Sequence, residues 1–259
     1  MKNVNVRNSN MKYGPNIVTD SLVFNFDAGN VKCTDADDAV ASMRDIATVA
    51  HSSRTDRGIT GTGNTGNMTF PTNAGATKVI DLSISAQGSS GDADDYDNRL
   101  ALDDDLLFAD EDAYSFEFVG KLNSGAVNTY QSLAGRGATS PWVIQHKAGA
   151  NSWTLRWRDN DGQYRTSDTQ TTSSTEWYHM VFTIATNRDI KFYVNGVGLN
   201  TVASTDTQFQ CNRIMAGYAS STNRYGYQGV MLCCRIYAKT LSDAEVLQNF
   251  NATRARVGI

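Results

Sequence analysis

The stretch Trp177–Gly196, WYHMVFTIATNRDIKFYVNG, holds two runs of alternating side chains separated by a short polar break. One side of the first run carries Tyr178, Met180, Phe182 and Ile184, and one side of the second run carries Ile190, Phe192 and Val194. Alternation with a period of two is typical of strands with one buried face. Residues 186–189 supply a turn, and Asn195-Gly196 supplies the positive φ values of the next turn. The stretch therefore predicts a β-hairpin.

The same alternation recurs along the chain, in segments 21–27 (SLVFNFD), 114–118 (YSFEF) and 153–158 (WTLRWR), and the apolar segment 229–237 (GVMLCCRIY) is predicted to be a closing strand. The chain has 259 residues, with 21 glycines, three prolines and 19% charged residues, a mixture that suits many short strands joined by turns. We find no internal repeat and no linker. Residues 20–259 are therefore predicted to form a single all-β domain, since such domains often reach this size.

Charge and cysteine usage narrow the classes of function. The net charge is −4 at pH 7 and no run is rich in Lys or Arg, which argues against a nucleic-acid partner. No apolar run approaches the roughly 20 residues of a membrane span, and we expect no secretory signal because residues 1–20 lack an apolar stretch. The cysteines have no CxxC spacing, so we expect reduced, mostly buried thiols and folding in a reducing cytoplasm. They are Cys33, Cys211, Cys233 and Cys234.

The two ends of the chain differ from the predicted domain. Residues 1–19 are rich in Asn and lack periodicity, so we expect an extended N-terminal arm that packs on its own domain or on a neighbouring molecule. Ser242 and Glu245 have capping-box spacing and predict one short C-terminal helix. The basic tail TRARVGI (253–259) follows; it either pairs with an acidic partner or only decorates the edge of the fold. The candidate assembly residues are Tyr13, Pro15, Arg254 and Arg256.

Several segments resemble the concanavalin A-like lectin/glucanase fold, in its laminin-G-like and pentraxin-like branch. WYHMVFTIATNRDIKFYVNGV is similar to the hairpin W-x-H-V-x-F-T…K-x-Y-V-N-G-x of that branch, and YGYQGVMLCCRIYAKTLSDAEVLQNFNATRARVGI is similar to its closing strand and helix. GDADDYDNRLALDD and SFEFVGKL resemble two further strands. The resemblance implies a jelly-roll-like sandwich of two antiparallel sheets. Residues 44–89 depart from the family pattern.

A narrower resemblance involves the two ends. YGPNIVTDSLVFNFDAGN and NFNATRARVGI are similar to single-domain proteins encoded by tailed bacteriophages. This resemblance implies a non-catalytic virion structural protein, assembled in the host cytoplasm and displayed on the particle as a capsid decoration protein. We expect a homo-oligomer, with a trimer as one form, anchored to a capsid or other virion protein by the N-terminal arm.

Hydrolysis of polysaccharides is the least favoured function, although the fold hosts glycosidases. A glycosidase needs two carboxyl groups across the scissile bond, and the glucanase branch carries them on an E-x-D-x-(x)-E strand that this sequence lacks. Glu111, Asp112 and Glu117 have the wrong spacing. No G-x-S-x-G motif accompanies the histidines, and we interpret His179, in mid-strand, as a partly buried structural residue. We therefore predict no catalytic residue and no enzyme activity.

Calcium is a possible ligand but no cofactor is required. Asp92, Asp94 and Asp95 offer hard oxygen ligands in a loop-rich segment, and some laminin-G and pentraxin domains bind Ca²⁺ through loop acids. The D-x-[DN]-x-[DN]-G loop is absent, however, and Asp is a common turn residue. The interpretation as a solvated turn is favoured over the metal site.

Glycan binding is the alternative to a purely structural role in the virion, as a lectin-like attachment module of the particle or its tail. It would use exposed aromatic side chains beside polar groups. Trp142, near a turn, and Tyr225 and Tyr227, beside Asn223-Arg224, are the candidate platforms. By contrast, Trp153, Trp157 and Trp177 have strand spacing and are expected in the core or at an interface.

Overall fold

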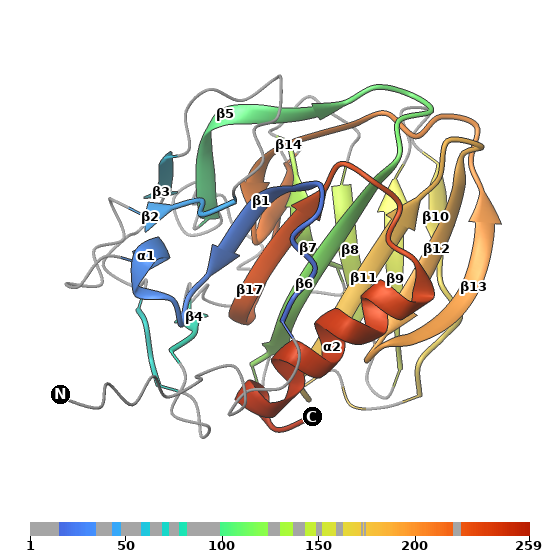
Figure 1. Ribbon diagram of the computed structural model, residues 1–259. Helices are drawn as coiled ribbons and strands as arrows, with labels where there is room; N and C mark the ends of the chain where they lie inside the picture. Colours follow the sequence, from blue (N-terminus) through green and yellow to red (C-terminus); the bar gives the residue numbers. More distant parts are fainter. Residues whose placement is uncertain are drawn as a thin grey trace, which may run out of the picture.

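The computed structural model places two antiparallel sheets face to face (Figure 1). It describes residues 16–34, 43–47, 58–62, 69–72, 78–81, 99–123, 130–136, 143–148, 152–158, 163–171, 173, 175–219 and 224–259. The all-β class predicted from the alternation and the sandwich of two antiparallel sheets implied by the resemblance are both confirmed. Of the helices in these residues, none is long and apolar enough to cross a membrane.

The front sheet of Figure 1 contains the hairpin and the closing strand. Its order is β1 (Leu22–Asp27), β17 (Gly229–Tyr237), β6 (Tyr114–Leu122), β11 (Tyr178–Ile184), β12 (Asp189–Val194) and β13 (Val197–Ala203), with β4 (Ile80–Asp81) paired to β17. The first and last strands of the described chain thus pair with each other, which brings the two ends of the domain together.

The back sheet has the order β10 (Tyr164–Thr166), β9 (Trp153–Arg158), β8 (Val143–Ala148), β7 (Tyr130–Gly135), β14 (Phe209–Ile214), β5 (Arg99–Phe108), β3 (Gly58–Thr62) and β2 (Met43–Arg44). A small ribbon pairs β15 (Ala216–Ala219) with β16 (Arg224–Gly226). Two helices complete the described part of the chain, the short α1 (Val31–Thr34) and the longer α2 (Asp243–Val257).

The main core lies between the sheets and is built from the alternation seen in the sequence. Phe182 on β11 stands opposite Phe192 on β12, and their rings meet edge to face at 5.3 Å. Trp153 and Trp157 of the back sheet are buried in the same cluster, so their predicted core position is confirmed. Burial of such large apolar side chains is the main favourable contribution to folding.

The hairpin turns have the predicted backbone geometry. Asn195 and Gly196 have φ values of 50° and 78°, which confirms the predicted positive-φ pair. A Cβ atom at Gly196 would lie 2.9 Å from Cδ1 of Phe250, so glycine is also needed to let α2 approach this turn. The turn therefore fixes both the hairpin and the position of the helix.

Helix α2 lies across the outer face of the front sheet (Figure 1). Ser242 and Glu245 form the predicted capping box, and Gly258 ends the helix at φ 79°. The helix runs through residue 257, so the expected basic tail is mostly helical. Two features explain this extension: Val257 is buried, and basic side chains in the last turn complement the helix dipole.

The four cysteines are free and buried, as predicted. Cys233 and Cys234 face opposite sides of β17, with Cys234 in the main core and Cys233 near the end of α2. Burial raises the pKa of the Cys233 thiol to about 12, which keeps it protonated and unreactive.

Residues 16–18 pack against α2. The backbone N–H of Val18 donates to Oδ1 of Asn249 at 2.7 Å, and Nε2 of Gln248 donates to the carbonyl of Asn16 at 2.7 Å. Val18 is itself buried. The remainder of the expected arm, with Tyr13 and Pro15, lies outside the described residues, and the division at residue 19 stays a prediction.

Candidate functional site

The outer face of the front sheet, beneath and beside α2, carries two neighbouring rows of polar side chains. In one row Thr183, Lys191 and Thr201 stand opposite one another on β11, β12 and β13. In the next row Glu117 on β6 is in register with Arg235 on β17. The second row lies under the helix, and the first lies beside its N-terminus.

The Glu117 cluster consists of Glu117, His179, Arg235, Tyr237 and Asn249. Nη1 of Arg235 and Nε2 of His179 both contact Oε1 of Glu117, the latter at 3.2 Å. The other carboxylate oxygen accepts from Nδ2 of Asn249 at 2.8 Å and from the hydroxyl of Tyr237 at 3.2 Å. All five side chains are buried, so the structure corrects the expectation that His179 is only partly buried.

The carboxylate of Glu117 is ionised and is closed off from solvent. Burial by itself opposes ionisation, but the charge of Arg235 and the hydrogen bonds from His179 and Tyr237 outweigh it and lower the pKa of Glu117 to about 2. Both carboxylate oxygens are occupied, and α2 covers them through Asn249. This carboxylate therefore joins the helix to the sheet and is not available to a substrate.

A second ion pair fixes the end of α2. Arg256 donates to both oxygens of Asp27, at 2.6 and 2.7 Å. Its guanidinium is thus engaged within the chain, and its role in assembly stays a prediction. Arg254, the other basic residue of this segment, is exposed and lies over the ring of Phe250 at 5.6 Å.

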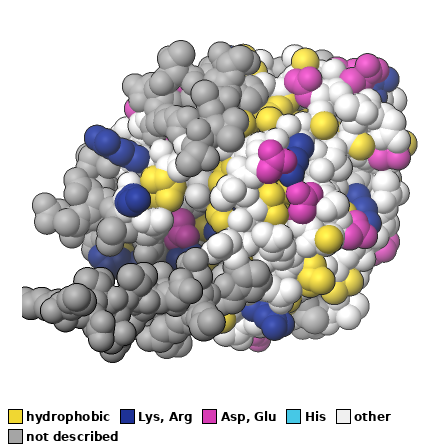
Figure 2. Space-filling model, in the orientation of Figure 1, with side chains coloured by type: hydrophobic (Ala, Val, Ile, Leu, Met, Phe, Trp, Pro, Cys, Tyr) yellow, Lys and Arg dark blue, Asp and Glu magenta, His cyan; other side chains and the backbone are white. Residues whose placement is uncertain are grey.

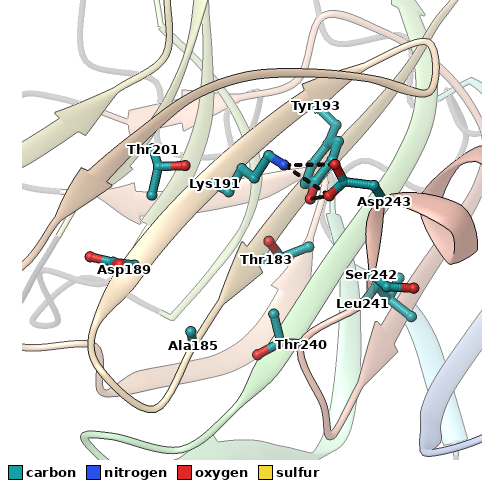
Figure 3. A pocket seen from close by; sticks show the side chains of 10 residues that line it. All are labelled: Thr183, Ala185, Asp189, Lys191, Tyr193, Thr201, Thr240, Leu241, Ser242 and Asp243. Carbon is teal, nitrogen blue, oxygen red and sulfur yellow. Dashed lines mark hydrogen bonds and ion pairs between the residues drawn. The ribbon is translucent and has the colours of Figure 1, made fainter.

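The row beside the helix N-terminus opens into a hollow of about 300 Å³, here called the α2 pocket (Figure 3). The strands contribute Thr183 and Ala185 from β11 and its turn, Asp189, Lys191 and Tyr193 from β12, and Thr201 from β13. The remaining lining residues are Thr240, Leu241 and Ser242 from the β17–α2 connection and Asp243, the first residue of α2. Three adjacent strands form its base, and the start of α2 forms one wall.

A charged triad lies at one side of the α2 pocket. Nζ of Lys191 donates to both carboxylate oxygens of Asp243, at 2.8 and 3.0 Å, and the hydroxyl of Tyr193 donates to Oδ1 at 2.8 Å. The bond with Asp243 raises the pKa of Lys191, and the same bond with Lys191 lowers the pKa of Asp243. Both groups are therefore charged at neutral pH. In Figure 3 dashed lines join the three side chains.

The base of the α2 pocket has hydrogen-bonding capacity that the chain does not use. Thr183 is only 2% exposed, and within the described part of the chain no group bonds its side-chain hydroxyl. Gly198 leaves room for this arrangement, because a Cβ there would lie 3.0 Å from Cε of Lys191. The hydroxyl oxygen of Thr183 is not among the fully buried polar atoms that lack a partner, so it is accessible from the pocket, where water or a ligand can bond it.

Most residues predicted from the sequence as binding sites are not brought together here. Asp92, Asp94, Asp95 and Trp142 lie outside the described residues, so the calcium and Trp142 predictions stay predictions. No three His, Cys, Asp or Glu side chains gather into a metal site in the ranges that are described. Tyr225 lies in β16.

Tyr227 is a correction. It was expected as an exposed platform, but it is fully buried, with its ring edge-on to Phe118 at 5.1 Å. The backbone N–H of Tyr227 donates to the carbonyl of Met215, which extends the pairing of β15 with β16, and the N–H of Met215 donates to the carbonyl of Leu133 in β7, which joins the ribbon to the back sheet. The ring therefore fills the core and is not available to a glycan.

Sequence reasoning did not single out the α2 pocket. The alternation in DIKFYV places Asp189, Lys191 and Tyr193 on one polar face, which was a usable signal. Asp243, however, is 52 residues from Lys191, and their meeting depends on where α2 packs. Figure 2 shows the face that carries α2, where acidic and basic side chains lie next to one another among the described residues.

Comparisons with known proteins agree with this architecture. Residues 94–247, more than half of the chain, match the family model described as the concanavalin A-like lectin/glucanases superfamily. No curated protein matches the sequence. Domain 4 of AbnA, a GH43 extracellular arabinanase from Geobacillus stearothermophilus, in complex with arabinotriose, is similar with a TM-score of 0.57 and 15% identity, over 90% of this chain and 99% of that domain.

Two toxin domains are similar over part of their length. The botulinum neurotoxin serotype D ligand-binding domain, in complex with N-acetylneuraminic acid, has a TM-score of 0.55 and 12% identity, over 90% of this chain and 51% of that one. The binding domain of Paraclostridial Mosquitocidal Protein 1 has a TM-score of 0.51 and 15% identity, over 89% and 52%. The chain spans about half the length of these domains, and identities this low indicate a shared fold alone.

Proposed function

Because the chain belongs to the concanavalin A-like lectin/glucanases superfamily, we propose that it is a non-catalytic carbohydrate-binding module. Function is carried by sites and not by folds, so the proposal needs a site in this chain. The α2 pocket is that site. Similar solved domains include one in complex with arabinotriose and one in complex with N-acetylneuraminic acid, which supports the ligand class.

The observation that carries the proposal is the unused hydrogen-bonding capacity of the α2 pocket. The hydroxyl of Thr183 has no partner in the described chain, and Thr201 adds an exposed hydroxyl at the rim, whereas the hydroxyl of Ser242 is engaged in the capping box. Leu241 and Ala185 add apolar surface. Sugar rings present hydroxyls around their edge and C–H groups on their faces, so a hollow with both kinds of surface suits them.

Hydrolysis is poorly supported by the carboxylates near this site. A glycosidase needs one carboxyl that holds a proton near neutral pH and a second that is ionised. Lys191 lowers the pKa of Asp243 and occupies both of its oxygens, so Asp243 does not serve as the acid. Glu117 is ionised and covered by α2. We therefore propose binding without turnover.

An array of neutral and acidic oligosaccharides tests the proposal. The chain should bind a subset of glycans, and Thr201→Trp, which fills the α2 pocket, should abolish binding. Thr186→Trp is the matched control, because Thr186 is exposed in the turn between β11 and β12 and does not line the pocket. Absence of binding to every glycan, or full binding by Thr201→Trp, would contradict the proposal.

A second role, compatible with the first, is that of a virion component such as a capsid decoration protein. The resemblance of the two chain ends to phage proteins favours it. Those ends meet in the fold, since β1 pairs with β17 and Val18 bonds Asn249 of α2. Residues 1–15 would then leave the domain beside α2 and anchor it, as a homo-oligomer, to a capsid protein.

Deleting residues 1–15 tests this second role. Val18 is buried, so a deletion that stops at residue 15 keeps the contacts with α2 and should leave the thermal midpoint of the domain unchanged. We expect the shortened chain to lose its place on phage particles, as judged by particle imaging and mass spectrometry. Equal occupancy of shortened and full-length chains on particles would contradict the role.

A further inference from the structure

The α2 pocket has the size of a single sugar residue. Its volume of about 300 Å³ lies at the lower end of the range of small-molecule sites, roughly 300–1,000 Å³. Figure 3 shows Thr183 in the middle of the lining residues, with Lys191, Tyr193 and Asp243 on one side and Ala185 and Thr240 on the other. A hollow with lining residues on both sides accepts the terminal sugar residue of a glycan more readily than an internal residue of the glycan chain.

The charges of the α2 pocket alternate in sign. Lys191 lies between two carboxylates that line the pocket, Asp189 two residues before it on the same face of β12 and Asp243 at the start of α2. These three groups give a net charge of −1, which disfavours an acidic ligand. Lys191 is also bonded to both oxygens of Asp243 and lies 4.9 Å from the ring centroid of Tyr193, so its charge is already shared with groups of the chain.

The net charge of −1 does not oppose a cationic ligand, but the pocket offers a cation little specific contact. Both oxygens of Asp243 are occupied by Lys191, whose ammonium group lies at one side of the pocket. Asp189 already accepts a hydrogen bond from Nδ2 of Asn187 at 2.8 Å. The groups that remain are hydroxyls, an ammonium that donates and carboxylates that accept. An uncharged ligand whose hydroxyls both donate and accept satisfies all of them.

We propose that the α2 pocket takes one uncharged terminal sugar residue and discriminates against uronic acids and sialic acids. This inference rests on the proposed carbohydrate-binding function and adds its substrate class. Lys191 and Asp243 act together as a fixed donor and acceptor, and Thr183 contacts the ring from the base of the pocket. Asp189 sets the discrimination against acids, because its charge is not balanced by a cation of the pocket.

Sugars matched in shape but not in charge test the substrate class. Methyl glucoside, methyl glucuronide and methyl glucosaminide form one set, methyl galactoside and methyl galacturonide a second, with arabinotriose and N-acetylneuraminic acid as further probes. Dissociation constants are measured by ligand-observed NMR at low and high salt. We expect a neutral sugar to bind best, with the matching acid at least about fivefold weaker, the factor for one unscreened charge near 4 Å.

Two variants make the result specific to the α2 pocket. Asp189→Asn should reduce the preference for the neutral sugar by about fivefold, and Glu176→Gln, an exposed carboxylate before β11 that does not line the pocket, should not. Thr201→Val should weaken binding of the neutral sugar, and Thr186→Val should leave it unchanged.

The outcomes separate the two proposals. If no sugar binds, the carbohydrate-binding function is contradicted, and this inference with it. If acids bind as tightly as neutral sugars and Thr201→Val weakens their binding, the function stands and the substrate class is wrong. If neutral sugars are preferred but neither Asp189→Asn nor Thr201→Val has an effect, the preference arises elsewhere and the assignment to this pocket is wrong.

Discussion

The Glu117 cluster and the α2 pocket are built from the same parts on the same face of the same sheet. Each contains a carboxylate, a cation that bonds it and a tyrosine hydroxyl that donates to it: Glu117 with Arg235 and Tyr237 in one, and Asp243 with Lys191 and Tyr193 in the other. The two regions differ in how far α2 covers them. The side chain of Glu117 is 0% exposed beneath α2, and that of Asp243 is 75% exposed at the start of the same helix.

This difference shows that cover by α2, more than charge, decides what a polar cluster can do. A sealed carboxylate whose four partners are all protein groups contributes to stability and holds two elements together. The exposed carboxylate of Asp243 can be separated from Lys191 at little cost in free energy, because an exposed ion pair is worth only about 0–1 kcal/mol. The helix thus divides one polar face into a structural part and a part that a ligand can reach.

The largest expected effect is on stability, from Glu117→Gln. The variant leaves the buried Arg235 with Asp27, 4.0 Å away, as its remaining countercharge in the described chain, and should lower the free energy of unfolding by about 3–5 kcal/mol. The matched change in the open region, Asp243→Asn, should cost less than about 1 kcal/mol. Urea unfolding followed by tryptophan fluorescence measures both, and equal losses in the two variants would remove the distinction between the regions.

The pH dependence of stability should show the same contrast. The pKa of Glu117 is about 2 in the folded chain against an ordinary value of 4.5, so its ionisation stabilises the fold. That contribution is complete above pH 4.5 and is lost as the pH falls toward 2. At about 1.4 kcal/mol per pKa unit it amounts to roughly 3 kcal/mol.

The stability difference between the wild-type chain and Glu117→Gln should therefore shrink between pH 4.5 and 2, because the glutamine variant has no such group to protonate. Unfolding curves at several pH values in this window provide the test. A difference that stays constant down to pH 2 would mean that Glu117 is not ionised through its contacts with the cluster.

The packing of α2 on the hairpin turn should have a smaller effect, seen by comparing two glycines. Gly196 and Gly258 both have φ near 79°, but a Cβ at Gly196 would meet Phe250 at 2.9 Å, and one at Gly258 would meet nothing within 4 Å. Gly258→Ala should cost about 1 kcal/mol, the strain of a left-handed residue. Gly196→Ala should cost roughly 1 kcal/mol more. Equal thermal shifts would mean that the helix is not seated on the turn.

The sandwich could be predicted from the sequence because its signal is local. The alternation in residues 177–196 specifies two strands, a buried face and a turn, and each of these depends on neighbours in the chain. The capping box at Ser242 is likewise local. The length of α2 was underestimated, because its last turn is held by the burial of Val257 and by the pairing of Arg256 with Asp27, 229 residues away.

The candidate site was harder to predict, since both polar regions depend on contacts distant in the sequence. Glu117 meets Arg235 and Asn249 across 118 and 132 residues. No sequence motif encodes such pairs. The predicted exposure of Tyr227 was also wrong, because this side chain lies next to polar residues in the sequence but packs into the core. Alternation assigns a side chain to a face, and tertiary packing decides whether that face is open.

A calorimetric titration with the best sugar of the array, on two single variants, tests the central claim most directly. Lys191→Met removes the cation of the α2 pocket, and Tyr237→Phe removes two hydrogen bonds from the Glu117 cluster, one donated to Glu117 and one accepted from Asn249. We expect Lys191→Met to lose at least tenfold in affinity at nearly unchanged stability, and Tyr237→Phe to lose stability at unchanged affinity. The opposite assignment, with affinity lost in Tyr237→Phe and kept in Lys191→Met, would contradict the account.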